Sequence, residues 1–126
     1  MNRTEAFNIL EERKITSVVV CYTGGNDEGG VDEIILNHED GSESKMEEWY
    51  DSPQYNTTTK KYEYNNTPTK DEQLSEFLCS PVYDSYGSFA GDFYVNGEIH
   101  WDVKTRKGTL SSDFETRFTE SSEQEV

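Results

Sequence analysis

The sequence predicts an α+β fold, with a single antiparallel sheet of four to six strands and two helices packed on one face. Two stretches rich in β-branched residues, 15–22 and 31–37, are separated by a glycine-rich segment, as in paired strands. A C-terminal stretch, 88–114, has near-alternating apolar residues and two turn signals. Two short amphipathic segments, one near the N-terminus and one at 71–79, are typical of helices that pack on a sheet.

The length and composition indicate one folded domain. A chain of 126 residues can bury one modest core. Only 32% of the residues are hydrophobic, but they cluster in the predicted strands and helices, and 13% of the residues are aromatic. We therefore expect a single domain over residues 1–120 and a flexible acidic tail over residues 121–126.

The N-terminal third is expected to form a helix followed by two strands. Thr4 is positioned to cap the helix, which places Phe7 and Leu10 toward the sheet. The strand at 15–22 contains three consecutive valines, a pattern that suits a central strand. The glycine-rich segment 24–30 is predicted to be a loop that joins this strand to an antiparallel neighbour.

The middle of the chain gives weaker signals. Residues 44–50 carry apolar and aromatic side chains at a spacing that fits one helical turn or an aromatic cover over the core. Residues 51–67 are rich in Asn, Thr and Tyr, and predict at most a marginal edge strand at 57–64. Two lysines in that strand are expected to hinder edge-to-edge association.

The second helix and the C-terminal strands have clearer boundaries. Thr69 and Glu72 have the spacing of a capping box, and Pro81 is expected to end the helix at about residue 79. Asn96-Gly97 is expected to be the tip of a hairpin, since both central residues of a type I′ turn need positive φ. Lys107-Gly108 is expected to be the next turn, before a strand at 109–114.

The charge excludes several classes of partner. The formal net charge is −15, and the segment from residue 24 to residue 51 contains many acidic residues but a single base, Lys45. Phosphate contacts need clustered Lys and Arg, so we expect neither direct nucleic-acid binding nor attachment to an anionic membrane. The sequence contains no apolar run of membrane-spanning length and no signal sequence, so a cytoplasmic location is expected. Cys21 and Cys79 are expected to be free thiols.

No catalytic residue, metal site or cofactor is predicted. The sequence contains no phosphate-binding glycine motif, no nucleophile elbow and no zinc-ligand spacing. Two alternatives stay open. In the first, the protein is a ligand-sequestering or metal-binding module that uses the segment 24–30 and the carboxylates near it. The second is a small hydrolase built on His100, Asp102 and Asp92.

Acidic and aromatic side chains occur together in one region, a mixture that suits recognition of a basic protein. Carboxylates of this kind can stand in for phosphates and reach the basic groove of a nucleic-acid-binding protein. A soluble domain whose acids only maintain solubility is the competing interpretation. The predicted partner-binding residues are Asp27, Glu28, Asp32, Glu33, Glu39, Asp40, Glu43, Glu47, Glu48, Trp49, Tyr50, Asp51 and Tyr55.

Two stretches carry a resemblance to known proteins. Residues 18–34 read Val-Val-Val-Cys-Tyr-Thr-Gly-Gly-Asn-Asp-Glu-Gly-Gly-Val-Asp-Glu-Ile, and residues 86–95 read Tyr-Gly-Ser-Phe-Ala-Gly-Asp-Phe-Tyr-Val before a later Gly108-Thr-Leu. Together they resemble a family of small phage and bacterial proteins of unknown function. The chain departs from that family at Glu28, where a small residue is common, and in its long insert at 51–67. No functional residue is transferred by this resemblance.

In size, acidity and lack of a catalytic set, the chain is similar in kind to phage-encoded inhibitors of bacterial immunity, such as anti-CRISPR proteins. This resemblance implies a non-enzymatic inhibitor that acts in the bacterial host cytoplasm. Its implied partner is a basic, nucleic-acid-binding defence nuclease, such as a CRISPR effector.

Overall fold

The computed structural model describes residues 1–25, 28–48, 54–63, 68–86, 94–115 and 120–126. These residues form two helices, a six-stranded sheet and a separate two-stranded sheet. The elements are α1 (Arg3–Glu12), β1 (Ile15–Gly25), β2 (Glu28–His38), β3 (Glu43–Met46), β4 (Gln54–Asn56), β5 (Lys61–Glu63), α2 (Lys70–Tyr86), β6 (Tyr94–Asp102), β7 (Lys107–Glu115) and β8 (Glu120–Glu125).

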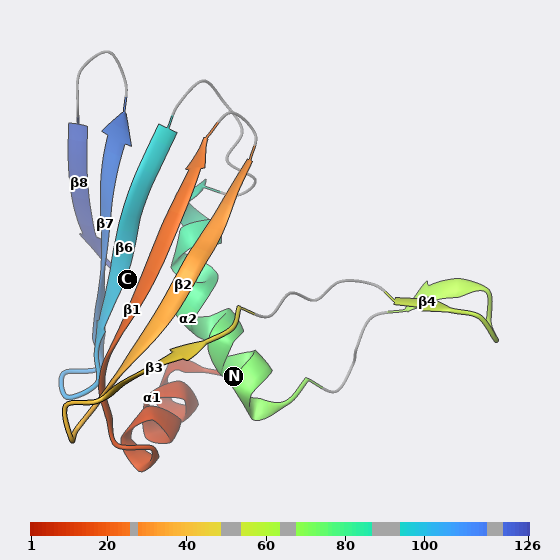
Figure 1. The fold of residues 1–126 in the computed structure, drawn as a ribbon, viewed down its shortest axis with the longest axis horizontal. Coiled ribbons are helices and arrows are strands. Elements are labelled where there is room, and N and C mark those ends of the chain that lie inside the picture. The colour runs from red at the N-terminus through yellow and green to blue at the C-terminus, as the bar shows by residue number, and fades with distance from the viewer. Residues whose placement is uncertain (26–27, 49–53, 64–67, 87–93, 116–119) are drawn as a thin grey trace.

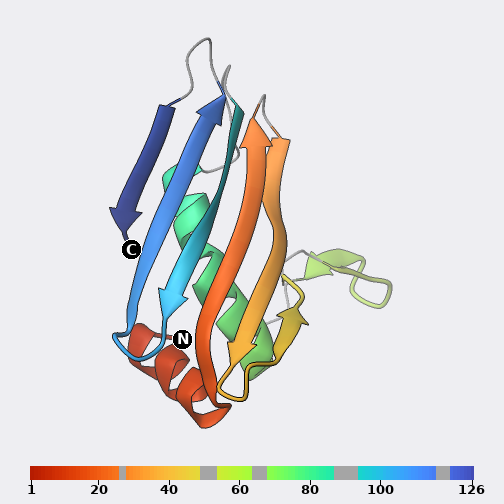
Figure 2. The same cartoon turned by 60° about the vertical axis from the view of Figure 1, so that its left-hand side comes forward.

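The large sheet has the strand order β3-β2-β1-β6-β7-β8, and every neighbouring pair is antiparallel. Both helices lie against the same side of it (Figures 1 and 2). The predicted fold class is therefore confirmed. The strand β1 is central, as its run of valines predicts. No helix in the described part of the chain is long and apolar enough to cross a membrane.

The core lies between the helices and the inner face of the sheet. Alternate residues of each strand point inward, so Val20, Ile34 and Ile99 lie beside one another on β1, β2 and β6. Trp101 is 1% exposed, and its Nε1–H donates to the Leu78 carbonyl oxygen at 3.1 Å. The other apolar residues at 0% exposure are Ala6, Phe7, Leu10, Val18, Leu74, Leu78 and Val82.

The capping box of α2 is confirmed, but the predicted end of the helix is wrong. The backbone N–H of Glu72 donates to Thr69 Oγ1, and the Thr69 N–H donates to a Glu72 carboxylate oxygen, both at 3.2 Å. The helix then continues through Pro81 to Tyr86. A proline cannot donate to the carbonyl four residues earlier, here that of Phe77. The Ser80 hydroxyl donates to this carbonyl oxygen instead, at 2.9 Å.

The predicted turn at Asn96-Gly97 is also wrong, because both residues lie inside β6, paired with β1 on one side and β7 on the other. The glycine serves close packing rather than a turn. A Cβ at Gly97 would lie 2.0 Å from the Ser111 carbonyl oxygen and 2.8 Å from the Tyr22 hydroxyl. The chain reverses instead over residues 103–106, and the predicted turn at Lys107-Gly108 falls inside β7.

Two predicted boundaries near the N-terminus need correction. The cap of α1 is Asn2 rather than Thr4, since the Asn2 Oδ1 accepts the Glu5 N–H at 2.8 Å. The glycine-rich segment is mostly strand: β1 extends to Gly25 and β2 begins at Glu28. Long antiparallel pairing with a neighbour satisfies the backbone of these glycines, which local propensity alone disfavours in a strand.

Three further segments differ from the prediction. Residues 43–46 form β3 rather than a helical turn, because they pair with β2 at the edge of the sheet. The segment expected as one edge strand is a two-stranded hairpin of β4 and β5. The expected flexible tail forms β8, which pairs with β7 and ends with the Val126 N–H donating to the Gly108 carbonyl oxygen at 2.9 Å.

Candidate protein-binding surface

The outer face of the six-stranded sheet, turned away from both helices, is covered by none of the described elements (Figures 1 and 2). We call it the open face. Strand alternation places on it the residues that are not in the core. Its bases are Lys45 and Lys107. Its acids come from all strands of the sheet except β1: Glu28, Glu33, Glu43, Glu98, Asp102, Asp113, Glu123 and Glu125.

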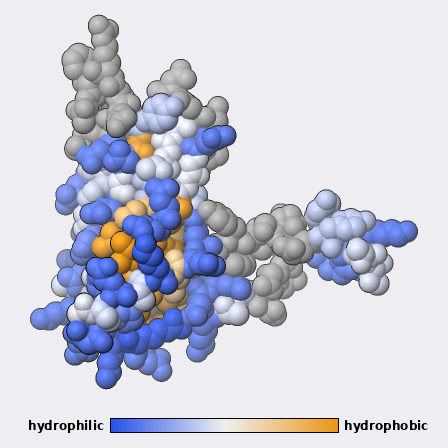
Figure 3. Space-filling model, viewed as in Figure 1, coloured by the Kyte–Doolittle hydropathy of each residue, from blue (hydrophilic) through white to orange (hydrophobic). Residues whose placement is uncertain are grey.

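The centre of the open face is apolar. Val19 lies directly between Ile35 of β2 and His100 of β6, and Cys21 follows it on β1. Figure 3 shows hydrophobic residues gathered over the middle of this face, with hydrophilic residues around them. An apolar centre inside a charged rim is the arrangement of a protein-binding surface.

The acids of the open face act on the Cys21 thiol. Burial is the largest cause that raises the pKa of Cys21, and the charges of Glu33, Glu98 and Asp32 raise it further. Burial raises the pKa of Cys79 to about 12, with a smaller contribution from Glu48. Both cysteines are free thiols, as predicted. The pKa of Cys21 therefore responds to its burial first and to the neighbouring negative charges second.

Removing two of these charges is expected to make Cys21 more reactive. The thiolate is the nucleophile, so a raised pKa slows alkylation at any pH below it, and a lowered pKa speeds it. In a Cys79→Ala background, Glu33→Gln with Glu98→Gln is expected to increase the rate of iodoacetamide alkylation at about pH 8 by about two- to five-fold. The pair Glu12→Gln and Glu76→Gln, on the helices, is the control. If the Cys79→Ala protein and both double variants were alkylated at equal rates, the predicted effect of Glu33 and Glu98 on the pKa of Cys21 would be wrong.

The structure brings together only part of the predicted partner-binding set. Glu33 and Glu43 lie on the open face, and Glu33 forms an ion pair with Lys45 at 3.0 Å. Asp32 lies at a register shift of β2, and both its carboxylate oxygens accept the Thr23 hydroxyl, at 3.2 and 3.0 Å. Asp32 and Glu33 are thus adjacent on β2, and Glu43 pairs with Asn37, four residues further along the same strand.

The other predicted residues are dispersed. Glu28 shares the open face by strand alternation but lies at its far end, where β2 begins, while residues 39–40 occupy the turn before β3. Glu47 follows β3, and Glu48 accepts the Tyr83 hydroxyl of α2, which draws it to the helical side. Tyr55 lies on the small hairpin. Asp27, Trp49, Tyr50 and Asp51 lie outside the described residues.

Sequence reasoning missed the acids that β6, β7 and β8 contribute to the open face. They lie far from the acidic segment in sequence, and only strand pairing brings them beside it. A signal was present in β6: Ile99 and Trp101 share one parity, so Glu98, His100 and Asp102 must point to the other side. In β8 no such apolar pattern exists.

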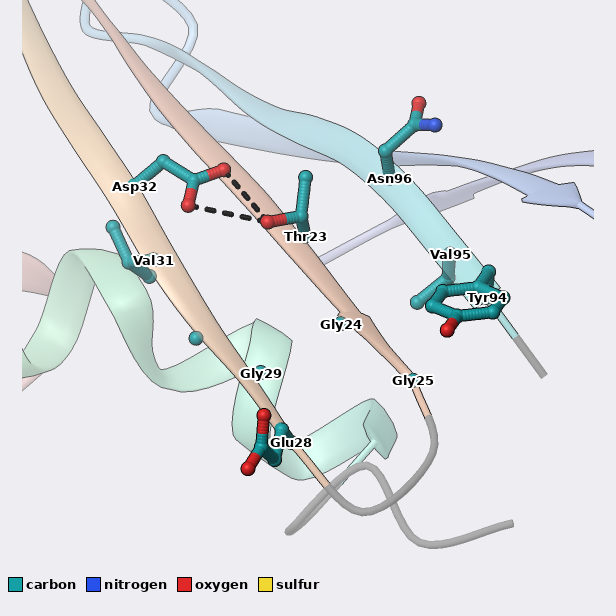
Figure 4. A pocket seen from close by; sticks show the side chains of 11 residues that line it. Thr23, Gly24, Gly25, Glu28, Gly29, Val31, Asp32, Tyr94, Val95 and Asn96 are labelled. Carbon is teal, nitrogen blue, oxygen red and sulfur yellow. Dashed lines mark hydrogen bonds between the residues drawn. The ribbon is translucent and has the colours of Figure 1, made fainter. Parts of the chain in front are cut away.

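The glycine-rich ends of β1 and β2 form a hollow of about 580 Å³ (Figure 4). We call it the glycine hollow. Gly24, Gly29 and Gly30 lie along it, Glu28 and Asp32 are its acids, and its other described lining residues are Thr23, Gly25, Val31, Tyr94, Val95 and Asn96. This lining contains no base, so it does not suit an anion. In the described residues, no three His, Cys, Asp or Glu side chains are grouped to hold a metal ion.

The residues of the hydrolase alternative are only partly placed. His100 is exposed on the open face between Val19 and Thr109. The Asp102 carboxylate accepts the Thr105 N–H at 3.2 Å and so shapes the β6–β7 turn. Asp92 lies outside the described residues. The neighbours of His100 in the sheet are thus an apolar residue and a hydroxyl.

Taken together, the fold and the open face define a small α+β protein with a six-stranded antiparallel sheet whose uncovered side is acidic. The chain belongs to DUF6878, a family of unknown function, whose sequence model matches residues 1–126. No curated protein and no solved structure matches it.

Proposed function

We propose that this protein is a non-enzymatic inhibitor that acts in the bacterial cytoplasm, where its acidic open face occupies the basic, nucleic-acid-binding groove of a defence nuclease. One observation carries the proposal: acids from five strands are gathered on one uncovered face around an apolar centre. Acids also lie on α1 and α2, where they serve solubility equally well. On the open face they surround an apolar centre, and this combination suits a partner with the opposite charge.

The geometry of a strand supports mimicry of a phosphate backbone. Side chains two residues apart on one face of a strand are about 6.8 Å apart, twice the 3.4 Å axial rise per nucleotide of one DNA strand. Glu123 and Glu125 on β8 have this relation, and Glu98 lies opposite Ser111, which in turn pairs with Glu123. A groove lined with Arg and Lys can therefore meet carboxylates at a repeating interval.

The two parts of the face have different roles in this proposal. Long-range attraction by the acids speeds the encounter and makes it sensitive to salt. Burial of Val19 and Ile35 at the centre would then set the residence time, as desolvated apolar contacts do in protein interfaces. If binding did not weaken as the ionic strength rises, this role of the acids in the encounter would be wrong.

The test is capture from bacterial lysate with the tagged protein, at low and moderate salt, followed by elution with a double-stranded oligonucleotide. We expect a nucleic-acid-binding protein that is released both by salt and by the oligonucleotide. For the triple variant Glu98→Gln, Glu123→Gln and Glu125→Gln, the amount of captured partner is expected to fall about ten-fold or more.

A variant with the same change of charge on the helical side is the control. Glu12→Gln, Glu76→Gln and Asp84→Asn are all exposed on α1 or α2. This triple variant is expected to retain the partner as the unchanged protein does. Equal loss in both triple variants would mean that only net charge matters, and the proposal for the open face would then be wrong.

A further inference from the structure

The hairpin of β4, a turn and β5 (residues 54–63) stands away from the body of the molecule in both views (Figures 1 and 2). We call it the arm. An isolated two-stranded hairpin is marginal in water, but side chains brace this one. Asn56 Oδ1 accepts the Thr58 N–H at 2.9 Å, and the Glu63 carboxylate accepts the Asn56 amide and the Thr59 hydroxyl, at 3.1 and 3.0 Å.

The arm presents two tyrosines to solvent. Tyr55 and Tyr62 pair directly across the hairpin with ring centroids 5.2 Å apart, and they are 54% and 70% exposed. Paired exposed aromatic rings are typical anchors of protein interfaces. Lys60 lies in the turn, and Lys61 pairs with Asn56 on the opposite face of the hairpin from the rings, while the charge of Glu63 is engaged inside the arm. The arm is therefore aromatic and basic in a molecule of net charge −15.

The glycine hollow has the complementary chemistry. Glycine backbone offers a flat surface on which aromatic rings can pack, and Gly24, Gly29 and Gly30 supply it. Glu28 and Asp32 place two carboxylates at the hollow (Figure 4), a charge opposite to that of the two lysines of the arm. Its Tyr94 is 55% exposed, which adds an aromatic contact.

We propose that the arm of one copy of this chain docks in the glycine hollow of a second copy, and that reciprocal exchange of two arms forms a two-fold symmetric dimer. Opposite charge on arm and hollow favours this occupant, and the arm projects outward from its own body. Because each copy donates one arm and one hollow, two contacts close the assembly. Neither Glu98, two residues beyond Asn96 on β6, nor Glu123 on β8 lines the hollow, so the open face can still receive a partner.

The test measures the mass of the purified full-length protein by sedimentation equilibrium over a wide range of concentration. Physiological ionic strength is chosen because a Debye length of about 8 Å screens the repulsion between two acidic bodies. We expect a reversible monomer–dimer equilibrium. Tyr55→Ser with Tyr62→Ser is expected to raise its Kd at least about thirty-fold, and the thermal transition of the body is expected to stay unchanged.

A charge exchange distinguishes docking in the hollow from non-specific association. Lys61→Glu alone and Glu28→Lys alone are expected each to raise the Kd several-fold, and their combination is expected to restore it. Lys104→Glu, in the exposed β6–β7 turn, is the matched control and should change little. A monomer at every concentration, or a dimer insensitive to the tyrosine variants, overturns the proposal. If the protein is a monomer and the arm variants no longer capture a partner from lysate, the arm binds that partner and not a second copy of the chain.

Discussion

Replacing Gly97 with alanine is expected to lower the free energy of unfolding by about 3 kcal/mol, and valine is expected to cost more. The reason is steric. A Cβ at this position would lie 2.0 Å from the Ser111 carbonyl oxygen, and the next neighbour is the Tyr22 hydroxyl at 2.8 Å. The Ser111 oxygen is backbone of the paired strand β7, so it cannot move without opening the sheet. Urea denaturation followed by circular dichroism measures the change.

Gly41→Ala provides the comparison. Gly41 lies in the β2–β3 turn with φ +88°, and a Cβ there would have no heavy atom within 4 Å. Its substitution should therefore cost only the backbone strain, about 1 kcal/mol. If Gly97→Ala costs no more than Gly41→Ala, the close approach of β6 and β7 does not limit the side chain at residue 97.

The Gly97 position shows what local sequence reasoning can and cannot predict. Asn-Gly between apolar runs is a strong hairpin signal, yet here β6 continues through it because β1 and β7 pair with it on both sides. The apolar pattern itself conflicts with a two-residue turn at this place, since Val95 and Ile99 point to the same face only if no turn separates them. Tertiary pairing, which the local pattern does not contain, decided the outcome.

The local sequence specifies the start of α2 but not its end. The capping box involves two residues three apart, so sequence alone specifies it. Continuation through Pro81 depends on Ser80, whose hydroxyl satisfies the Phe77 carbonyl, and on burial of Val82 against the sheet. Neither the hydroxyl contact nor the burial is visible without the fold.

The candidate surface was predictable only where it is contiguous in sequence. Glu33 and Glu43 could be predicted because they lie in a segment, residues 24–51, that is visibly rich in acidic residues. Glu98 required the parity of β6, and Glu123 required the strand β8, whose sequence has no apolar alternation. A surface built from every second residue of neighbouring strands can be identified only when the order of those strands is known.

Replacing Trp101 with alanine is expected to lower the free energy of unfolding by about 4 kcal/mol, which would leave little of the stability of a domain this size. Trp101 is almost fully buried, and its ring packs against Phe7 and Phe77 at centroid distances of 6.0 and 5.4 Å. It joins both helices to β6, since Phe7 belongs to α1 and Phe77 to α2. Truncation therefore removes the contact shared by three elements and leaves a cavity.

Trp101→Phe separates packing from hydrogen bonding. Phenylalanine keeps an aromatic ring in the core but leaves the Leu78 carbonyl oxygen without the indole N–H that donates to it at 3.1 Å. The Leu78 carbonyl lies inside α2 and keeps the Val82 N–H as its helical donor. Loss of the indole hydrogen bond therefore costs about 0.5–1.5 kcal/mol, and the smaller ring adds a small cavity. We therefore expect Trp101→Phe to fall between the unchanged protein and Trp101→Ala in denaturation midpoint. Tyr62→Ala, at a side chain 70% exposed, should change the midpoint little. If Trp101→Ala behaved like Tyr62→Ala, the helices would not depend on this residue for their attachment to the sheet.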